Sequence, residues 1–421
     1  MVSGVRLARL SSPDPRIAPA ALAVGRALAW YIREVPLAEQ PPVSLAQAEQ
    51  LRDVLAGSRP LADEDFEILV SFARTMYRFG QVDPSIPQVN LGDVLTALSV
   101  VPQADEVPSI FDTRIDADAV AKLQFRETSA GIGKSQRENR EGWWSHAQKN
   151  RAFIEDVVRQ TQGRGLAVIL GAGHAFDLPL VELAKSFEKL VLVDIDADTL
   201  NATAAGVFKD PGLRARTELR LLDLTGVNGQ LVRRIDDAVA SAASAADARD
   251  RLEALCWTYR LVPPPRLLPP EECADLLVSS CVLSQVSWPQ RVYARRVYER
   301  RFSALPGPLE RQWARHFTYL ELRLQQDHLT SLADVAEQVA LTCDVVSNIT
   351  VLDAAGVERK SGRIIPTLGV PSLLERVPKL FAVEGHASWE WGFSKATRAG
   401  NGSRMDVEGV RLTLPQPPSS L

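Results

Sequence analysis

The most chemically informative residues form a glycine-containing turn near the middle of the chain. An apolar run ends at Leu170 and passes directly into Gly171 and Gly173, and a second apolar run ends in Asp194, 23 residues after the first glycine. Glycines at such a turn let the backbone approach a ligand where a Cβ atom would clash. A carboxylate at the end of the next strand can accept hydrogen bonds from two ribose hydroxyls. The spacing therefore predicts a nucleoside-binding crevice.

Two other nucleotide-binding fingerprints are incomplete. The dinucleotide pattern Gly-x-Gly-x-x-Gly requires a third glycine for close helix packing, and this chain has Phe176 at that position, which disfavours NAD or FAD. Residues 133–135 match the end of a phosphate-binding loop, but Thr128 replaces its opening glycine and no apolar strand leads into it. We therefore expect an irregular connection there.

The glycine turn resembles motif I of class I S-adenosylmethionine-dependent methyltransferases, with Gly171 and Gly173 as its first two glycines. Two positions depart from the family pattern, because Ile169 stands where an acid is expected and Ala175 replaces the third glycine. The contacts implied at the methionine end of the cofactor are therefore less well supported than the contact to its ribose.

Later segments follow the order of the same family, and the resemblance covers roughly residues 140–414. A third strand ends at Asp223, and a fourth strand, opened by Asp275, leads into a polar loop that in the family faces cofactor and substrate. The resemblance implies S-adenosyl-L-methionine as cofactor. The implied cofactor-binding residues are Gly171, Ala172, Gly173, Asp194, Ile195, Asp223, Leu224, Ser280 and Cys281.

Methyl transfer from a sulfonium is an in-line displacement, and its leaving thioether needs no acid. Holding the acceptor aligned in a dry pocket supplies much of the acceleration, and a base helps only when the acceptor carries a proton. The candidate catalytic residues are His146, before the first strand, His174, in the glycine turn, and Gln285, after the fourth strand. A structural role for each histidine is the alternative.

Composition limits the class of protein. The 421 residues are 46% apolar with a net charge of −4, which fits a globular protein of about two domains and gives no reason to expect a nucleic-acid partner. No apolar run reaches the roughly 18 residues of a membrane span, and Arg6 and Arg9 interrupt any signal sequence. The four cysteines form no Cys-x-x-Cys pair, so we expect neither a metal site nor disulfides, and a cytoplasmic location.

The chain divides by pattern into several parts. Apolar residues at helical spacing over 19–35, 44–55, 63–79 and 90–101 predict an N-terminal helical domain, residues 1–110. Residues 111–142 are predicted as a connector, 143–415 as the Rossmann-like domain with an insertion at 226–272, and 416–421 as a flexible tail. Three roles are open for the N-terminal helices: they cover one face of the sheet, they gate access of the substrate, or they form the interface with a second copy of the chain or with a partner subunit.

Within the second domain, strands alternate with helices. Strands are expected at 167–170, 190–194, 218–222 and 275–280, with helices at 176–187 and 197–206, which predicts parallel βαβ units. Strand patterns also occur at 338–345, 348–351, 387–393 and 405–414, with a short helix at 371–380. The fold class is α/β: a Rossmann-like methyltransferase sheet, parallel with an antiparallel C-terminal strand pair, plus the helical domain.

Three functions remain open from the sequence. The first is a methyltransferase acting on a small-molecule or protein acceptor. The second uses the same cofactor to transfer its aminocarboxypropyl or aminopropyl group, and the third is a non-catalytic partner protein on the same fold. A basic stripe on the predicted helix 290–302 either attracts an anionic substrate or is a solvated face paired with Glu299.

Overall fold

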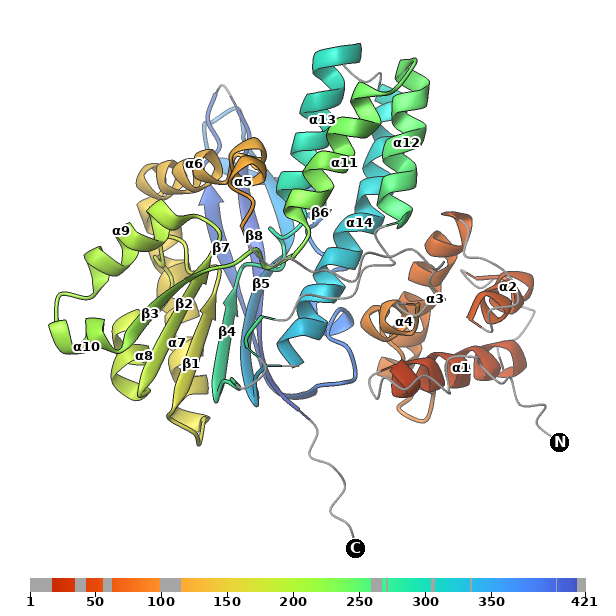
Figure 1. Cartoon of the computed structure of the whole chain (residues 1–421). Coiled ribbons are helices and arrows are strands. Elements are labelled where there is room, and N and C mark those ends of the chain that lie inside the picture. The colour runs from red at the N-terminus through yellow and green to blue at the C-terminus, as the bar shows by residue number, and fades with distance from the viewer. Residues whose placement is uncertain are drawn as a thin grey trace, which may run out of the picture. The chain divides into compact units, whose positions relative to one another are not determined.

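The structure, a computed structural model, describes residues 17–34, 43–55, 63–98, 115–258, 267–269, 272–303, 307–333, 335–398 and 400–414 (Figure 1). These residues fall into two compact units. One comprises the described residues before 109 together with Leu374–Ala382, and the other lies within Ser109–Leu373 and Val383–Leu414. The predicted tail, residues 416–421, and residues 111–114 of the predicted connector lie outside the described residues.

The first unit is helical, as the apolar spacing predicts. Its helices are α1 (Ile17–Glu34), α2 (Leu45–Leu55), α3 (Asp63–Val82) and α4 (Leu91–Leu98). A capping box precedes α2, because the amide of Gln47 donates to Ser44 Oγ at 3.2 Å and the amide of Ser44 donates to Gln47 Oε1 at 2.8 Å. Tyr31 and Phe72 meet edge to face in the core of this unit.

The stretch predicted as an irregular connector is helical instead. It forms α5 (Ala117–Leu123) and α6 (Phe125–Glu138), followed by α7 (Arg140–Gln160). Asp116 caps α5 by accepting a hydrogen bond from the amide of Ala119 at 3.0 Å. Residues 133–135 lie inside α6, so their glycine and lysine belong to a helix and form no phosphate-binding loop.

The second unit is built on one sheet with the strand order β3-β2-β1-β4-β5-β8-β7, and β6 pairs with β5 (Figure 1). The first four strands are parallel: β1 (Leu166–Leu170), β2 (Lys189–Asp194), β3 (Thr217–Leu221) and β4 (Leu276–Ser280). Each lies within one residue of its predicted position, because apolar runs in β1, β2 and β4 and the alternation of apolar and polar residues in β3 are local signals for a strand.

The C-terminal part of the sheet is antiparallel, which confirms the predicted closing pair. Its strands are β5 (Gln338–Leu352), β6 (Glu358–Pro366), β7 (Ala382–Ser394) and β8 (Gly402–Thr413). β5 runs parallel to β4 and antiparallel to β8. Where the sequence predicts two strands, β5 is continuous and extends well beyond the end of β4. The helix predicted at 371–380 is reduced to a short 3-10 turn, Leu373–Glu375.

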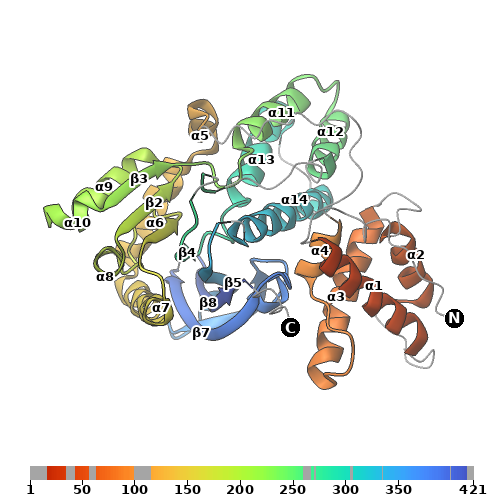
Figure 2. The same ribbon diagram turned by 60° about the horizontal axis from the view of Figure 1, so that its bottom comes forward.

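Helices connect and cover the parallel strands (Figure 2). Connecting helices are α8 (Leu180–Ser186), α9 (Ala197–Val207) and α10 (Pro211–Ala215). Alternate residues of β1 and β4, including Ile169 and Val278, form one apolar core with Ile154 of α7 and Leu183 of α8. α8 begins four residues later than predicted, because the glycine turn continues through Pro179.

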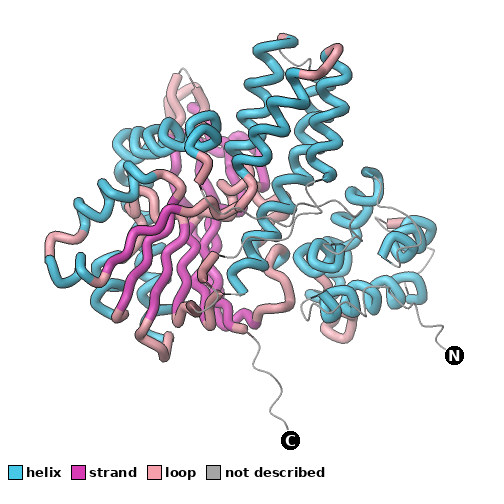
Figure 3. The backbone as a smooth tube through the Cα atoms, viewed as in Figure 1, coloured by secondary structure: helices cyan, strands magenta, loops and turns pink. Residues whose placement is uncertain are grey.

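A second apolar core lies among the remaining helices, which Figure 3 shows as a group beside the sheet. They are α11 (Asn228–Ala240), α12 (Ala245–Thr258), α13 (Trp288–Phe302) and α14 (Gly307–Ala333). The predicted insertion, residues 226–272, contains α11 and α12 as separate helices, since the chain turns between Ser241 and Ser244. Prolines 263–265 of the predicted insertion lie outside the described residues. No helix in the described part of the chain is long and apolar enough to span a membrane.

Candidate functional site

The carboxyl ends of β1 to β4 meet at one edge of the sheet because the four strands are parallel. The turns that follow them begin at Gly171, Ile195, Leu222 and Cys281. Ligands of open α/β sheets bind in the crevice outside this edge. The predicted cofactor-binding residues therefore gather at the expected place.

The two glycines of the turn after β1 serve different purposes. Gly171 has φ +64°, and a Cβ there would lie 2.4 Å from Val282 Cγ2, so the close approach of the loop after β4 requires glycine. Gly173 has φ +43°, but a Cβ would meet only Gly171 O at 3.7 Å and Asp194 Oδ2 at 3.8 Å. Space therefore remains beside Gly173 at the crevice.

Ala175 keeps the backbone shape of the glycine that it replaces. Its φ is +51°, in the left-handed region that a side chain disfavours by roughly 1–2 kcal/mol. The departure from the family pattern therefore changes the residue type and not the course of the turn. Phe176 is partly buried against the aromatic cluster of Trp143 and Trp391, where a third dinucleotide glycine would be needed.

Asp194 is held in place by backbone amides at the end of β2. Gly173 N donates to Oδ2 at 2.7 Å, and Asp196 N donates to Oδ1 at 2.9 Å. Burial raises the pKa of Asp194, and the amides of Asp196, Gly173 and Ile195 act against that rise. Since each carboxylate oxygen can accept more than one hydrogen bond, Asp194 retains the capacity to accept two hydroxyls.

Asp223 is occupied by its own loop. Its carboxylate accepts hydrogen bonds from Thr225 N at 2.9 Å, Thr225 Oγ1 at 2.7 Å, Asn228 N at 2.8 Å and Asn228 Nδ2 at 2.9 Å. Burial raises the pKa of Asp223, and these donors oppose the rise. In this structure the side chain fixes the turn into α11, and its role in cofactor binding stays a prediction. Leu224 packs partly against the apolar core of α11 to α14.

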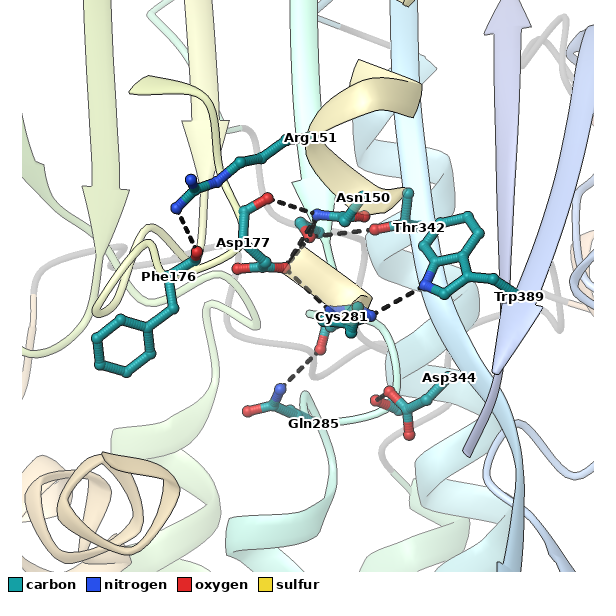
Figure 4. A network of polar contacts seen from close by, with 12 residues as sticks. Asn150, Arg151, Phe176, Asp177, Cys281, Gln285, Thr342, Asp344 and Trp389 are labelled. Atoms are coloured by element: carbon teal, nitrogen blue, oxygen red, sulfur yellow. Dashed lines mark hydrogen bonds and ion pairs between the residues drawn. The ribbon is translucent and has the colours of Figure 1, made fainter. Parts of the chain in front are cut away.

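A polar network joins α7, the glycine turn, β4 and β5 (Figure 4). Asn150 Nδ2 donates to Asp177 Oδ2 and to Ser280 Oγ, each at 2.9 Å. Ser280 Oγ donates to Asp177 Oδ2 at 3.0 Å and lies 3.1 Å from Thr342 Oγ1. Among the described residues, the fully buried Asn150 Oδ1 has no hydrogen-bond partner. A buried amide oxygen without a donor is costly, so this atom is suited to a ligand N–H.

Asp177 is the charged centre of this network. Burial favours its neutral form, but the hydrogen bonds from His146 and Ser280 act against burial, and the pKa of Asp177 is lowered. The side chain is about one-fifth exposed. The sequence places Asp177 at the end of the glycine run but gives it no role, and its position after that run is the only signal that could have found it.

His146 has both ring nitrogens engaged. The indole of Trp389 donates to Nδ1 at 3.0 Å, and Nε2 lies 3.5 Å from Asp177 Oδ2. An indole is only a donor, so Nδ1 accepts and the ring proton lies on Nε2, facing the carboxylate. Trp391 stacks on the ring at 4.1 Å between centroids. A role as proton acceptor, which stays a prediction, requires His146 to lose one of these contacts.

His146, Asp177 and Cys281 have the spacing of a metal-ligand set, with one donor atom of each within 4.8 Å of the others. A metal would need an unprotonated Nε2 and a thiolate. The Trp389 hydrogen bond places the proton on Nε2, and burial, followed by the charges of Asp344 and Asp177, raises the pKa of the Cys281 thiol. The geometry therefore favours a His146–Asp177 pair beside a protonated Cys281 thiol over a metal centre.

The loop after β4 is fixed from both sides. Cys281 has φ +52° and donates its amide to Thr342 O at 2.8 Å. Gln285 Nε2 donates to Cys281 O at 2.8 Å, so the amide predicted to be catalytic holds the loop in this structure. Ser284 Oγ donates to Asp344 Oδ1 at 2.5 Å. Burial raises the pKa of Asp344 to about 6, with the Ser284 hydrogen bond acting against it.

Sequence reasoning missed Asp344. An acid inside the mostly apolar strand pattern 338–345 is a signal that could have found it, because buried carboxyl groups with shifted pKa values concentrate at functional sites. His174, predicted to be catalytic, stacks on Phe176 at 5.0 Å between centroids and lies beside α6.

Two other predicted features lie away from the crevice. Asp275 is at the amino end of β4, where its carboxylate accepts from Leu166 N at 2.8 Å, so it stabilises the opposite edge of the sheet. The basic stripe on α13 is largely paired: Arg291 with Glu321 at 2.7 Å and Arg295 with Glu299 at 2.8 Å. Arg301 donates to the backbone oxygens of Ala240, the last residue of α11, and of Ala242 in the loop that follows.

Comparisons with known proteins find distant structural similarity only. No family model and no curated protein matches the chain. Solved structures similar to it include the glycopeptide N-methyltransferase MtfA complexed with S-adenosyl-L-methionine, at 12% identity and a TM-score of 0.32, covering 63% of this chain and 94% of that one. A SAM-dependent methyltransferase from Aquifex aeolicus has 13% identity and a TM-score of 0.31, covering 68% and 98%.

Magnesium protoporphyrin IX methyltransferase (ChlM) from Synechocystis PCC 6803, with bound SAM, is a third similar structure. It has 11% identity and a TM-score of 0.30, covering 71% of this chain and 99% of that one. At these identities and TM-scores the likenesses carry no argument about this chain. The function proposed below therefore depends on the strand order and on the geometry of the crevice.

Proposed function

We propose that this protein is an S-adenosylmethionine-dependent methyltransferase that transfers a methyl group in line to a small-molecule or protein acceptor. The observation that carries the proposal is the pairing of Gly173 and Asp194. The amide of Gly173 orients the Asp194 carboxylate at the carboxyl edge of the sheet, and a Cβ at residue 173 would meet nothing closer than 3.7 Å. An oriented acid beside an open glycine backbone suits a ribose.

The residues present fit this cofactor at three points. Asp194 would accept from the ribose hydroxyls, and the backbone around Gly173 would lie against the cofactor. Asn150 Oδ1, which is buried and without a donor among the described residues, would accept from the α-ammonium group, and the ionised Asp177 beside it would balance that charge. Ser280, at the end of β4, and Cys281, the first residue of the loop after it, both lie beside Asp177.

The cofactor supplies a methyl group on a sulfonium, an electrophile whose leaving group departs as a neutral thioether. The protein has to orient the acceptor and exclude water from the site. The network that ties α7 to the glycine turn and to β4 holds the walls of the crevice together, because Asn150 contacts both Asp177 and Ser280. The interlocked aromatic side chains of Trp143 and Trp391 keep the adjoining region apolar.

Calorimetry with S-adenosylmethionine tests the proposal. We expect Asp194→Asn to weaken binding about 10- to 100-fold, because hydrogen bonds to a charged group contribute about 1.5–3 kcal/mol and each 1.4 kcal/mol is tenfold in Kd. Asp156→Asn is the matched control, since Asp156 is an exposed acid on α7 that pairs with Arg159. Absence of binding to the wild-type protein, or equal affinity in the Asp194 variant, would refute the proposal.

A further inference from the structure

Asp344 is a buried acid that the function proposed above leaves unused. β4 ends at Ser280, whose partner on β5 is Thr342, but β5 continues to Leu352. Asp344 is two residues beyond Thr342 and therefore lies on the same face of β5, past the end of the neighbouring strand. Figure 4 shows its carboxyl group beside Cys281 and Gln285 of the loop after β4.

The backbone around Asp344 is irregular in a way that redirects a side chain. Asp344 pairs with Val407 of β8, and Val346 pairs with Asp406, so Val345 is an extra residue that forms a bulge. Such bulges are frequent beside active sites. The Asp344 side chain is almost fully buried, and Ser284 Oγ donates to its Oδ1 at 2.5 Å. A buried carboxyl group is costly to maintain, which indicates that its position serves a purpose.

Titratable groups from several elements surround Asp344. His146 on α7, Cys281 in the loop after β4 and Cys343 on β5 interact with it electrostatically. Glu408 on β8 and Asp177 on the glycine turn act on those two cysteines. Because burial raises the pKa of Asp344 to about 6, the carboxyl group is mainly ionised at neutral pH and exchanges protons close to it.

We propose that Asp344 is the general base of this site and that the acceptor is a protic nucleophile, with a nitrogen or oxygen that carries a proton. The proposal rests on the methyltransferase function given above. Of the two oxygens of Asp344, Oδ1 accepts from Ser284, and Oδ2 is assigned to the acceptor. Ser284 is a positioning residue that holds the carboxylate toward the loop after β4.

The step balances without a further reactant. The acceptor atom gains the bond to the methyl carbon, the carbon–sulfur bond breaks with its electron pair on sulfur, and the acceptor proton moves to Asp344 Oδ2 and then to water. The histidines are less suited to this task. Both nitrogens of His146 are engaged by Trp389 and Asp177, and His174 stacks on Phe176.

Proton release on cofactor binding tests the position of Asp344 without knowledge of the acceptor. Calorimetry at pH 6 in buffers of different ionisation enthalpy compares S-adenosylmethionine with S-adenosylhomocysteine, which share the amino acid and nucleoside but differ in the sulfonium charge. A nearby cation lowers a carboxyl pKa by one unit or more, so we expect S-adenosylmethionine to release about 0.4 proton more than S-adenosylhomocysteine.

Asp344→Asn should abolish this difference. The matched control is Asp406→Asn, an acid on the adjacent strand β8 whose carboxylate accepts from Asn348 at 3.0 Å, and it should leave the difference unchanged. Equal proton release by the two ligands, or a difference that survives in Asp344→Asn, would overturn the inference. Failure of S-adenosylmethionine to bind would instead overturn the proposed function.

A second measurement covers the case in which Asp344→Asn does not fold. In the wild-type protein, affinity for S-adenosylmethionine relative to S-adenosylhomocysteine should rise about tenfold per unit of pKa shift as the pH passes upward through about 6. Ser284→Ala removes the hydrogen bond that lowers the Asp344 pKa, so the midpoint should move to higher pH. A flat ratio, or an unmoved midpoint, would contradict the inference.

Discussion

The two glycines of the turn after β1 should respond differently to the same substitution. Gly171→Ala places a Cβ at φ +64° and 2.4 Å from Val282 Cγ2, whereas Gly173→Ala places one at φ +43° with no atom nearer than 3.7 Å. Alanine in the left-handed region costs roughly 1–2 kcal/mol, and overpacking a core adds about 1–3 kcal/mol. We expect Gly171→Ala to lower the free energy of unfolding by about 2–5 kcal/mol and Gly173→Ala by about 1–2 kcal/mol.

Urea unfolding followed by tryptophan fluorescence measures these changes, and a double-mutant cycle isolates the clash. Val282→Ala removes the methyl group that the new Cβ meets, so the double variant Gly171→Ala, Val282→Ala should be about 1–3 kcal/mol more stable than the sum of the single effects predicts. Ligand binding should show the reverse order. Gly173→Ala puts its methyl group beside Asp194 Oδ2 and should weaken S-adenosylmethionine binding about tenfold or more.

The refuting result is specific. If Val282→Ala gives no favourable coupling with Gly171→Ala, the close approach of the loop after β4 does not explain the first glycine. If Gly173→Ala binds S-adenosylmethionine as tightly as the wild-type protein, the backbone at residue 173 does not face the cofactor. Gly171→Ala and Gly173→Ala carry the same chemical change. The explanation of Gly171 by packing and the explanation of Gly173 by ligand binding are therefore tested independently.

Two further predictions concern stability. Ser279 Oγ lies 2.9 Å from His328 Nε2, and burial lowers the pKa of His328 from 6.5 to about 4. Protonation of His328 therefore favours the unfolded chain, so the stability that neutral His328 allows is present above pH 6.5 and is lost as the pH falls toward 4. Urea unfolding at each pH should show a loss of about 3 kcal/mol relative to His328→Gln. An equal pH dependence in the variant would contradict this assignment. Ala175→Gly should stabilise the fold by about 0.5–1 kcal/mol, because glycine relieves the strain of the left-handed backbone at φ +51° but has a larger chain entropy in the unfolded state. A destabilised variant in the same unfolding assay would show that Ala175 is not strained.

The sequence predicts the parallel strands well because their signal is local. β1, β2 and β4 are short, largely apolar runs that are buried along nearly their whole length, and β3 alternates apolar with polar residues. β6 has no such signal, since almost every residue of Glu358–Pro366 is exposed and the strand is specified by its pairing with β5. The break between α11 and α12 is equally weak in sequence, because the small residues between Ser241 and Ser244 are compatible with a helix.

The residues of the candidate site also differ in how well the sequence predicts them. Gly171, Gly173 and Asp194 are recognisable because a single turn and the following strand fix their relative positions. The network of Asn150 with Ser280 joins residues 130 apart in sequence, so no spacing rule could reveal it. For Asp223 the position at the end of β3 is predicted correctly, but its hydrogen bonds are not. They lie within residues 223–228 and depend on local geometry that the sequence pattern does not specify.

The electrostatics of the crevice favour a cation. Asp177, Asp194 and Asp344 all lie near the carboxyl edge of the sheet, and burial disfavours the charged form of each. Only Asp177 receives enough hydrogen bonds and charge to lower its pKa, whereas the pKa values of Asp194 and Asp344 are raised. A positively charged ligand would stabilise all three carboxylates at once, while an anionic nucleotide phosphate would oppose them. S-adenosylmethionine carries both a sulfonium and an ammonium group, so the same charges that disfavour a dinucleotide favour this cofactor.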